Sequence, residues 1–169
     1  ESRGLGDVYK RQRIEYQYLT NDARELGRMI YDSGITTYYN REIMDYALMR
    51  VESGTMLIEA ALLEDEKCYG RLRFTLAHEL AHYIIHKRIF SGTGVAAALY
   101  NNDTDEDATE WQANYLAKAI LMPNGQIKRC FYALHPVCKT KNEYVCKMAE
   151  IFEVSKQAME IRLKEFALI

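Results

Sequence analysis

The distribution of apolar and polar residues along the chain predicts a protein built mainly from helices. Residues 70–87 are apolar around much of the circumference of a helix, which is typical of a buried helix. Ser155 suits the N-cap of a helix, whereas Pro123 and Pro136 break helices. The predicted helices are residues 20–33, 41–50, 70–87, 102–122, 126–133, 142–152 and 155–166.

Two short segments predict strands. Residues 35–39 are β-branched and aromatic, and residues 55–60 follow a turn at Ser53 and Gly54. Because helical segments dominate, the predicted fold class is α+β and predominantly helical. We expect a small β-sheet beside the helix of residues 70–87, since an apolar helix needs a face to pack against.

The chain divides into a leader and one domain. Residues 1–12 are polar and show no hydrophobic period, so we expect them to be foreign to the domain or to lack stable order. Residues 13–169 have the length of one ordinary domain, with neither an internal repeat nor a dividing linker. We therefore predict a single domain over residues 13–169.

Composition narrows the classes of function. The net charge of −2 provides no general attraction to nucleic acid or anionic lipid. No apolar run is long enough to span a membrane and no secretory leader is visible, so we expect a cytoplasmic protein with no membrane partner and no direct nucleic-acid contact. The cysteines are expected to be reduced thiols, and their spacing does not predict a zinc knuckle; they are Cys68, Cys130, Cys138 and Cys146.

The helix of residues 70–87 contains the pattern His-Glu-x-x-His, formed by His78, Glu79 and His82. Residues four apart lie on one face of a helix, so the two imidazoles can bind one zinc ion, with Glu79 beside them as a general base. The pattern alone also occurs by chance in helices. In an apolar helix, however, ionisable groups are costly unless they are used, so we favour a metal site over coincidence.

A catalytic zinc ion usually takes three protein ligands and keeps one position for water, so a third ligand is needed. Glu110 is the best candidate, because it lies on a separate helix whose apolar face can pack against the first. The alternative for Glu110 is a solvated helix residue. Glu106 and Asp107 better suit the charge preference of a helix N-terminus. His86 and His135 complete the set of candidates.

Two residues are expected to support the site without binding the metal. Asn114 lies one turn beyond Glu110 and can accept the second ring N–H of His78 or His82, which would fix the tautomer of that ligand. His86 lies one turn after His82, where it can line the cleft or orient a product. It is a poor ligand candidate, because three residues one turn apart on a straight helix cannot converge on one ion.

A transition-state donor is the remaining part of the site. His135 follows an irregular segment and is a candidate for this role, and the alternative is an exposed loop histidine before a proline. Tyr83 and Tyr132 are weaker candidates for the same role.

Three blocks in the chain, in this order, resemble the ImmA/IrrE family of zinc metallopeptidases. They are residues 74–82 (FTLAHELAH), 110–117 (EWQANYLA) and 120–123 (ILMP). Residues 152–166 are similar to the C-terminal segment of that family, and the whole resemblance covers roughly residues 20–169. Three blocks in order are far more specific than the zinc motif alone.

The resemblance implies a zincin-like domain with a small β-sheet beside the His-Glu-x-x-His helix. It also implies that His78, His82 and Glu110 bind zinc and that Glu79 is the catalytic base. Gln112 departs from the family, which often has a second acid at this position, but the ligand position is unaffected.

The resemblance further implies an intracellular endopeptidase that acts on a protein partner. In this family the partner is often a helix-turn-helix transcriptional repressor of a mobile element or a stress operon. Zinc-dependent cleavage of a regulatory protein is therefore the expected function.

Two other functions stay open at the level of sequence. Residues 148–163 have the look of a helix-turn-helix with Val154 and Ser155 at the turn, which would suit a DNA-binding regulator. The second helix carries Glu160 and Glu165 beside its basic residues, whereas a groove-reading helix is usually more basic. We therefore expect these helices to pack on the protease core and shape its cleft. The third possibility is a zinc-binding scaffold that binds its partner without hydrolysis.

Overall fold

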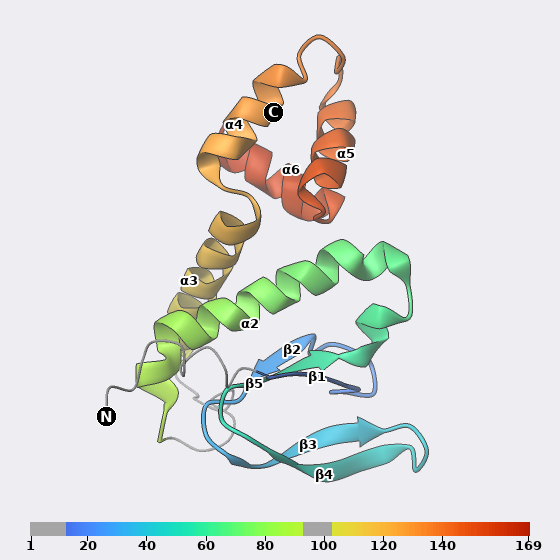
Figure 1. The fold of residues 1–169 in the computed structure, drawn as a ribbon, viewed down its shortest axis with the longest axis vertical. Helices are drawn as coiled ribbons and strands as arrows, with labels where there is room; N and C mark the ends of the chain where they lie inside the picture. Colours follow the sequence, from blue (N-terminus) through green and yellow to red (C-terminus); the bar gives the residue numbers. More distant parts are fainter. Residues whose placement is uncertain (1–12, 93–102) are drawn as a thin grey trace, which may run out of the picture.

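A computed structural model describes residues 13–92 and 103–169 of the chain, and within residues 103–107 it describes only the backbone. The first part is rich in strands and the second is helical (Figure 1). The strands are β1 (Arg13–Gln17), β2 (Gly27–Met29), β3 (Gly34–Asn40), β4 (Asp45–Val51) and β5 (Thr55–Glu59). The α-helices are α2 (Tyr69–Phe90), α3 (Asp103–Leu121), α4 (Asn124–Ala133), α5 (Lys141–Phe152) and α6 (Lys156–Glu165), and two 3₁₀ turns, η1 (Ala60–Leu63) and η2 (Glu66–Cys68), precede α2.

A three-stranded sheet in the order β1-β5-β2 forms the centre of the first part. The central strand β5 pairs in parallel with β1 and antiparallel with β2. All five residues of β5 are buried, as expected for a strand covered on both faces, and the three at its centre are apolar. Strand β2 therefore lies at an edge of this sheet.

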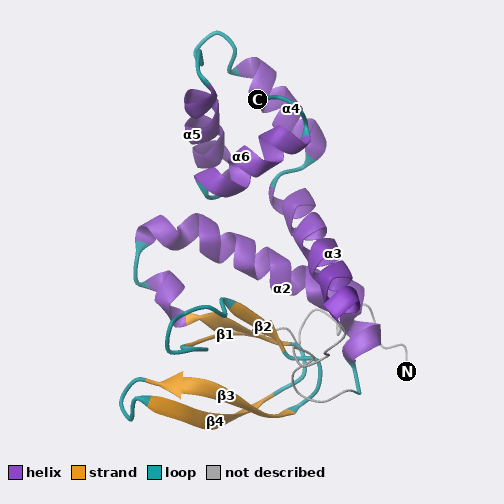
Figure 2. Ribbon diagram, turned by 180° about the vertical axis from the view of Figure 1, so that it is seen from behind, coloured by secondary structure: helices purple, strands orange, loops and turns teal. Residues whose placement is uncertain are grey.

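Helix α2 covers one face of the sheet and the β3–β4 hairpin lies on the other side (Figures 1 and 2). The core under α2 includes Met56 and Ile58 of β5 together with Leu72 of the helix. On the opposite face, Leu57 packs with Val51 from the hairpin. Adjacent residues of β5 thus serve two different layers, because side chains alternate along a strand.

Two predicted helices are wrong. Residues 20–33 contain β2 and its flanking loops, and residues 41–50 contain a turn followed by most of β4. In β4 exposed and less exposed residues alternate up to the buried Val51, which is the period of a strand. In the first segment, strand pairing outweighs the helical spacing of apolar residues, since Leu26 and Ile30 both form backbone hydrogen bonds beside β5.

The other predicted elements are confirmed. Residues 35–39 and 55–60 correspond to β3 and β5, and α2 is longer than its predicted range of 70–87 by a few residues at its C-terminal end. The four helices predicted downstream are present, and the α+β, predominantly helical fold class with a small sheet beside α2 is confirmed. The leader predicted at residues 1–12 lies outside the described residues. None of the described helices combines the length and the apolar character that crossing a membrane requires.

Helices α4, α5 and α6 share a second hydrophobic core that includes Ile127, Met148 and Leu163. The N-terminal part of α2 contacts the turn between α5 and α6. Arg73 donates hydrogen bonds from Nη1 to the carbonyl oxygens at the end of α5, at 2.8 and 2.9 Å. The sharp turn that follows, with Glu153 in the left-handed region and Ser155 as the cap of α6, therefore lies against α2.

Replacing Gly70 tests this contact. A Cβ at Gly70 would lie 2.6 Å from the backbone nitrogen of Ser155 and 2.6 Å from the carbonyl carbon of Val154. Glycine to alanine in a helix normally stabilises by up to about 1 kcal/mol. Here we expect Gly70→Ala to lower the free energy of unfolding by about 1–3 kcal/mol, because backbone atoms cannot move aside easily. Urea denaturation measures the change.

Gly125→Ala in α4 is the matched control for this prediction. An added Cβ there meets no atom within 4 Å, so the free energy of unfolding should stay the same or rise. If Gly70→Ala were as well tolerated as Gly125→Ala, the close packing of α2 on the α5–α6 turn would be contradicted.

Candidate metal centre

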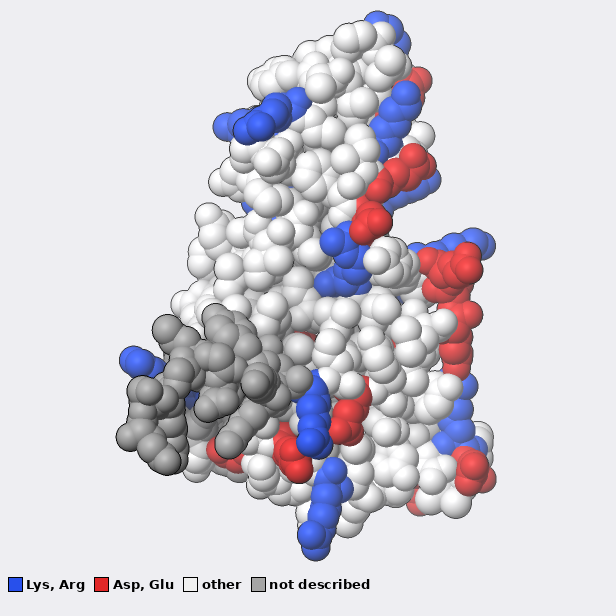
Figure 3. Space-filling model, viewed as in Figure 1, with Lys and Arg blue, Asp and Glu red and all other residues white. Residues whose placement is uncertain are grey.

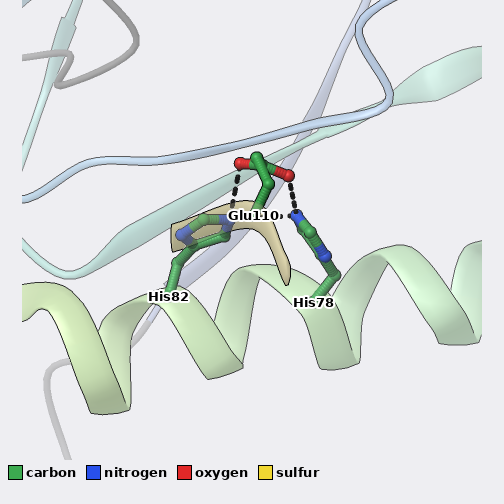
Figure 4. A group of neighbouring side chains, drawn as sticks. All are labelled: His78, His82 and Glu110. Carbon is green, nitrogen blue, oxygen red and sulfur yellow. Dashed lines mark hydrogen bonds and ion pairs between the residues drawn. The ribbon is translucent and has the colours of Figure 1, made fainter. Parts of the chain in front are cut away.

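The side chains of the His-Glu-x-x-His motif meet a carboxylate from a second helix. His78 and His82 lie one turn apart on α2 and point toward Glu110 of α3 (Figure 4). Helices α2 and α3 pack against each other along this contact. The apolar character of α2 explains the arrangement, because the helix must bury itself against both the sheet and α3.

Glu110 spans the two imidazoles. Its Oε1 lies 3.0 Å from Nε2 of His82, and its Oε2 lies 3.2 Å from Nε2 of His78. The two Nε2 atoms are 3.0 Å apart. Ligand atoms around a tetrahedral zinc ion, with bonds of about 2.1 Å, lie about 3.4 Å from one another. The three side chains thus fit a small tetrahedral cation with little movement, and they form a group that could hold a metal ion.

The carboxylate of Glu110 and the imidazole of His78 stabilise each other's charged forms. Hydrogen bonds with His78 and His82 hold the pKa of Glu110 far below its usual value. Burial lowers the pKa of His78, but the hydrogen bond to Glu110 and the charge of Glu79 outweigh burial, so the pKa is raised. The negative charge of the Glu110 carboxylate would attract a metal cation in the same way.

Glu79 lies beside the ligands, with 6% of its surface exposed. Burial raises the pKa of Glu79 to about 7, although the neighbouring imidazoles act in the opposite direction. The edge strand approaches this side chain closely. A Cβ on Gly27 of β2 would lie 2.6 Å from Oε1 of Glu79 and 2.8 Å from Cγ2 of Thr75. Only a glycine allows this approach without displacement of a neighbour.

The second ring nitrogens of the two histidines have different surroundings. Nδ1 of His82 lies 3.1 Å from Nδ1 of His86, which is fully buried. Nδ1 of His78 is buried and has no hydrogen-bond partner among the described residues. Asn114 stands beside His78, where its side chain contributes to the raised pKa of that imidazole. The structure therefore brings Asn114 and His86 to the centre, each next to a different histidine.

The centre opens into a cavity of about 770 Å³. Its lining includes β2, part of α2 and the region of α3 around Glu110. Tyr31 also lines this cavity, and burial together with the charges of Glu79 and Glu110 raises its pKa. The sequence analysis missed Gly27 and Tyr31, because both lie in the segment wrongly predicted to be a helix. An isolated glycine in an apolar segment was the available signal for close backbone approach at Gly27.

His135, a candidate for the transition-state donor, makes its described contacts within the region of α4 and α5. His135 lies after α4, where its Nδ1 is 2.6 Å from the hydroxyl group of Tyr144. His135 is exposed and is not among the described residues that line the cavity. The reason is that its segment belongs to the hydrophobic core of α4 to α6, and its ring packs against Phe131.

The remaining candidates also lie elsewhere. Neither Tyr83 nor Tyr132 is among the described residues that line the cavity. Tyr83 accepts a hydrogen bond from Lys87, and Tyr132 is exposed on α4. The side chains of Glu106 and Asp107 lie outside the described residues.

Comparison with known protein families identifies the class of protein. The profile of the IrrE N-terminal-like domain, which defines peptidase family M78, matches residues 62–164. The match includes α2, α3 and all three candidate ligands. The chain therefore belongs to this family of metallopeptidases, the ImmA/IrrE family that the sequence blocks resemble, and the zincin-like fold is confirmed. A search of curated proteins finds no match to the chain.

Metal analysis tests the centre directly. We expect about one divalent metal ion per chain, because the site offers three protein ligands. Replacing Glu110 by glutamine removes one of these ligands together with its charge. The metal affinity should fall by more than the 10–100-fold that is typical when only a partner of a ligand is lost, that is by more than about 100-fold. Competition with a chelator measures the affinity.

Glu160→Gln is a suitable control, since Glu160 pairs with Lys164 on the surface of α6. Its metal affinity should equal that of the unmodified chain. Equal metal binding by Glu110→Gln and Glu160→Gln would contradict the assignment of Glu110 as a ligand.

Proposed function

We propose that this protein is a zinc-dependent endopeptidase that cleaves a regulatory protein. The observation that carries the proposal is the convergence of His78, His82 and Glu110 beside Glu79 in one open cavity. Two imidazoles and one carboxylate are a ligand set typical of catalytic zinc, with one position left for water. The membership in a metallopeptidase family supports the same conclusion.

The residues of the centre would have different roles in peptide hydrolysis. A bound zinc ion would act as a Lewis acid that activates water and polarises a carbonyl oxygen. Glu79 accepts the proton of the attacking water and returns it to the leaving amine. Its position supports this role, because it follows the ligand His78 directly and lines the same cavity.

The edge strand β2 supports a peptide as the substrate. Leu26 and Ile30 form backbone hydrogen bonds on the side of β5. In an antiparallel pair the intervening Gly27 and Met29 direct their backbone groups to the outer edge. That edge borders the cavity, so an extended peptide can pair with it and pass the metal ligands.

The identity of the substrate is inferred from the family resemblance. We propose a helix-turn-helix transcriptional repressor in the same cytoplasm, and no direct contact of this protein with nucleic acid. The turn between α5 and α6 supports the second point. A recognition helix presents its N-terminal residues to bases, whereas the start of α6 lies against α2 near Gly70. Among the described residues on the face in Figure 3, basic and acidic side chains are also interspersed, without a continuous basic strip.

Glu79→Gln separates hydrolysis from metal binding. With a helix-turn-helix repressor encoded next to this protein as the substrate, we expect zinc affinity to be kept and cleavage to fall by at least about 10²–10⁴-fold, the contribution typical of a general base. Gel analysis of the cleavage products and chelator competition measure the two properties.

Glu160→Gln again serves as the control and should cleave normally. Full cleavage by Glu79→Gln would rule out this base. Binding of the repressor with zinc present and no cleavage by the unmodified protein would favour a scaffold without hydrolysis.

Gly27→Ala tests the contact between the edge strand and Glu79. The added Cβ would press on Glu79 and Thr75, so we expect the carboxylate to be displaced. A misplacement of about 1 Å can cost about 10²-fold in rate, so kcat/KM should fall by about that factor. Zinc affinity should change little, because Gly27 faces the base and not the ligands. Unaltered kcat/KM would contradict the role of this close approach, and Gly125→Ala is the control.

A further inference from the structure

His86 connects the metal ligand His82 to the second helix. It is fully buried one turn beyond His82, and its ring packs edge-on against Phe90. Its Nδ1 lies 3.1 Å from Nδ1 of His82, and its Nε2 lies 3.0 Å from Oε1 of Gln112. Gln112 stands on α3 two residues after Glu110, so α3 reaches the histidines of α2 at two points.

Metal binding by His82 would determine which ring nitrogens of His82 and His86 carry a proton. If Nε2 of His82 binds a metal ion, that nitrogen carries no proton, so the neutral ring must carry its proton on Nδ1. The only protein group at hydrogen-bond distance from His82 Nδ1 among the described residues is Nδ1 of His86, which must then accept. The proton of neutral His86 consequently lies on Nε2, from which it donates to the amide oxygen of Gln112.

Each hydrogen bond in the chain determines the next. Gln112 offers an acceptor oxygen, which selects the tautomer of His86 with the proton on Nε2. That tautomer offers a bare Nδ1 to His82, which in turn leaves Nε2 of His82 free to bind the metal. The opposite order of protons would leave a proton on the metal-binding nitrogen of His82.

We propose that His86 and Gln112 are positioning residues that fix the tautomer and ring orientation of His82 and thereby set the affinity of the metal centre. This inference rests on the proposed metal-binding role of His82. It extends that role by assigning functions to a buried histidine and to a glutamine on the other helix, neither of which touches the metal.

The two ligand histidines differ in this respect. Nδ1 of His78 has no hydrogen-bond partner among the described residues. The hydrogen bonds that run from Gln112 through His86, here called the relay, therefore reach His82 alone. A change at Gln112 should therefore affect one ligand and leave the contacts of His78 with Glu110 intact.

Variants of Gln112 in the 169-residue chain test this sequence of hydrogen bonds. Gln112→Leu keeps the approximate size of the side chain and removes the acceptor, so we expect zinc affinity to fall about 10–100-fold in chelator competition. Gln112→Glu keeps an acceptor oxygen and should bind zinc at least as tightly as the unmodified protein. Gln126→Leu, at an exposed position of α4, is the matched control and should leave affinity unchanged. Equal affinity of Gln112→Leu and Gln126→Leu would overturn the proposal.

A spectroscopic measurement reads the protons themselves. Long-range proton–nitrogen correlation spectra of the zinc-loaded protein should show His82 protonated on Nδ1 and His86 protonated on Nε2. In Gln112→Leu the spectra should show His86 as a mixture of the tautomers protonated on Nε2 and on Nδ1. A His86 protonated on Nδ1 in the unmodified protein would also overturn the relay.

The outcomes distinguish this inference from the proposed function. Absence of zinc binding by the unmodified protein would contradict both. Normal zinc binding and cleavage in Gln112→Leu would contradict the relay alone. Retained cleavage in Glu79→Gln would contradict the hydrolytic mechanism and leave the relay standing.

Discussion

The contact of the Glu110 carboxylate with the imidazoles of His78 and His82 ties together two helices that the chain separates by a long connection. The two imidazoles are largely buried, whereas the carboxylate is half exposed. Burial removes water from the two histidines, and an apolar helix offers them no other partner. The carboxylate is a hydrogen-bond partner for both imidazoles. A metal ion would be a partner for all three side chains. The candidate functional centre is therefore also an interhelical contact.

Helix α2 is held on several sides around this centre. The sheet packs under it, α3 packs along it, and the turn between α5 and α6 lies against its N-terminal part. These contacts cover much of the apolar surface of the helix, whereas Ile84 and Ile89 near its C-terminal end are exposed. The contact with the sheet also restricts the position of the Glu79 side chain, because that side chain lies between its own helix and the strand that carries Gly27.

The pair of helices α5 and α6 shows how a familiar local shape can serve another purpose. A left-handed residue at Glu153 and the cap at Ser155 produce a sharp turn between them, as in a helix-turn-helix. The turn is used for packing, since Arg73 donates to the carbonyl groups at the end of α5. Local geometry alone did not decide between a DNA-reading element and a support for the metallopeptidase fold. The surroundings of the turn favour the second.

The sequence by itself determined the helices of the second half and the chemical character of the centre. Both are encoded locally, since helical periodicity repeats within a few residues and His78, Glu79 and His82 lie within five positions of one another. It was also sufficient to select Glu110, because the family blocks place that residue at a definite distance from the motif.

Only the tertiary structure decided which segments became strands and what surrounds the centre. Residues 20–33 carry a helical spacing of apolar residues, yet pairing with β5 makes part of them an edge strand. His86 and Gln112 meet across two helices, and His135 is held away by the core of α4 to α6. These features depend on contacts between residues far apart in the chain, and no local pattern reports the free energy of such contacts.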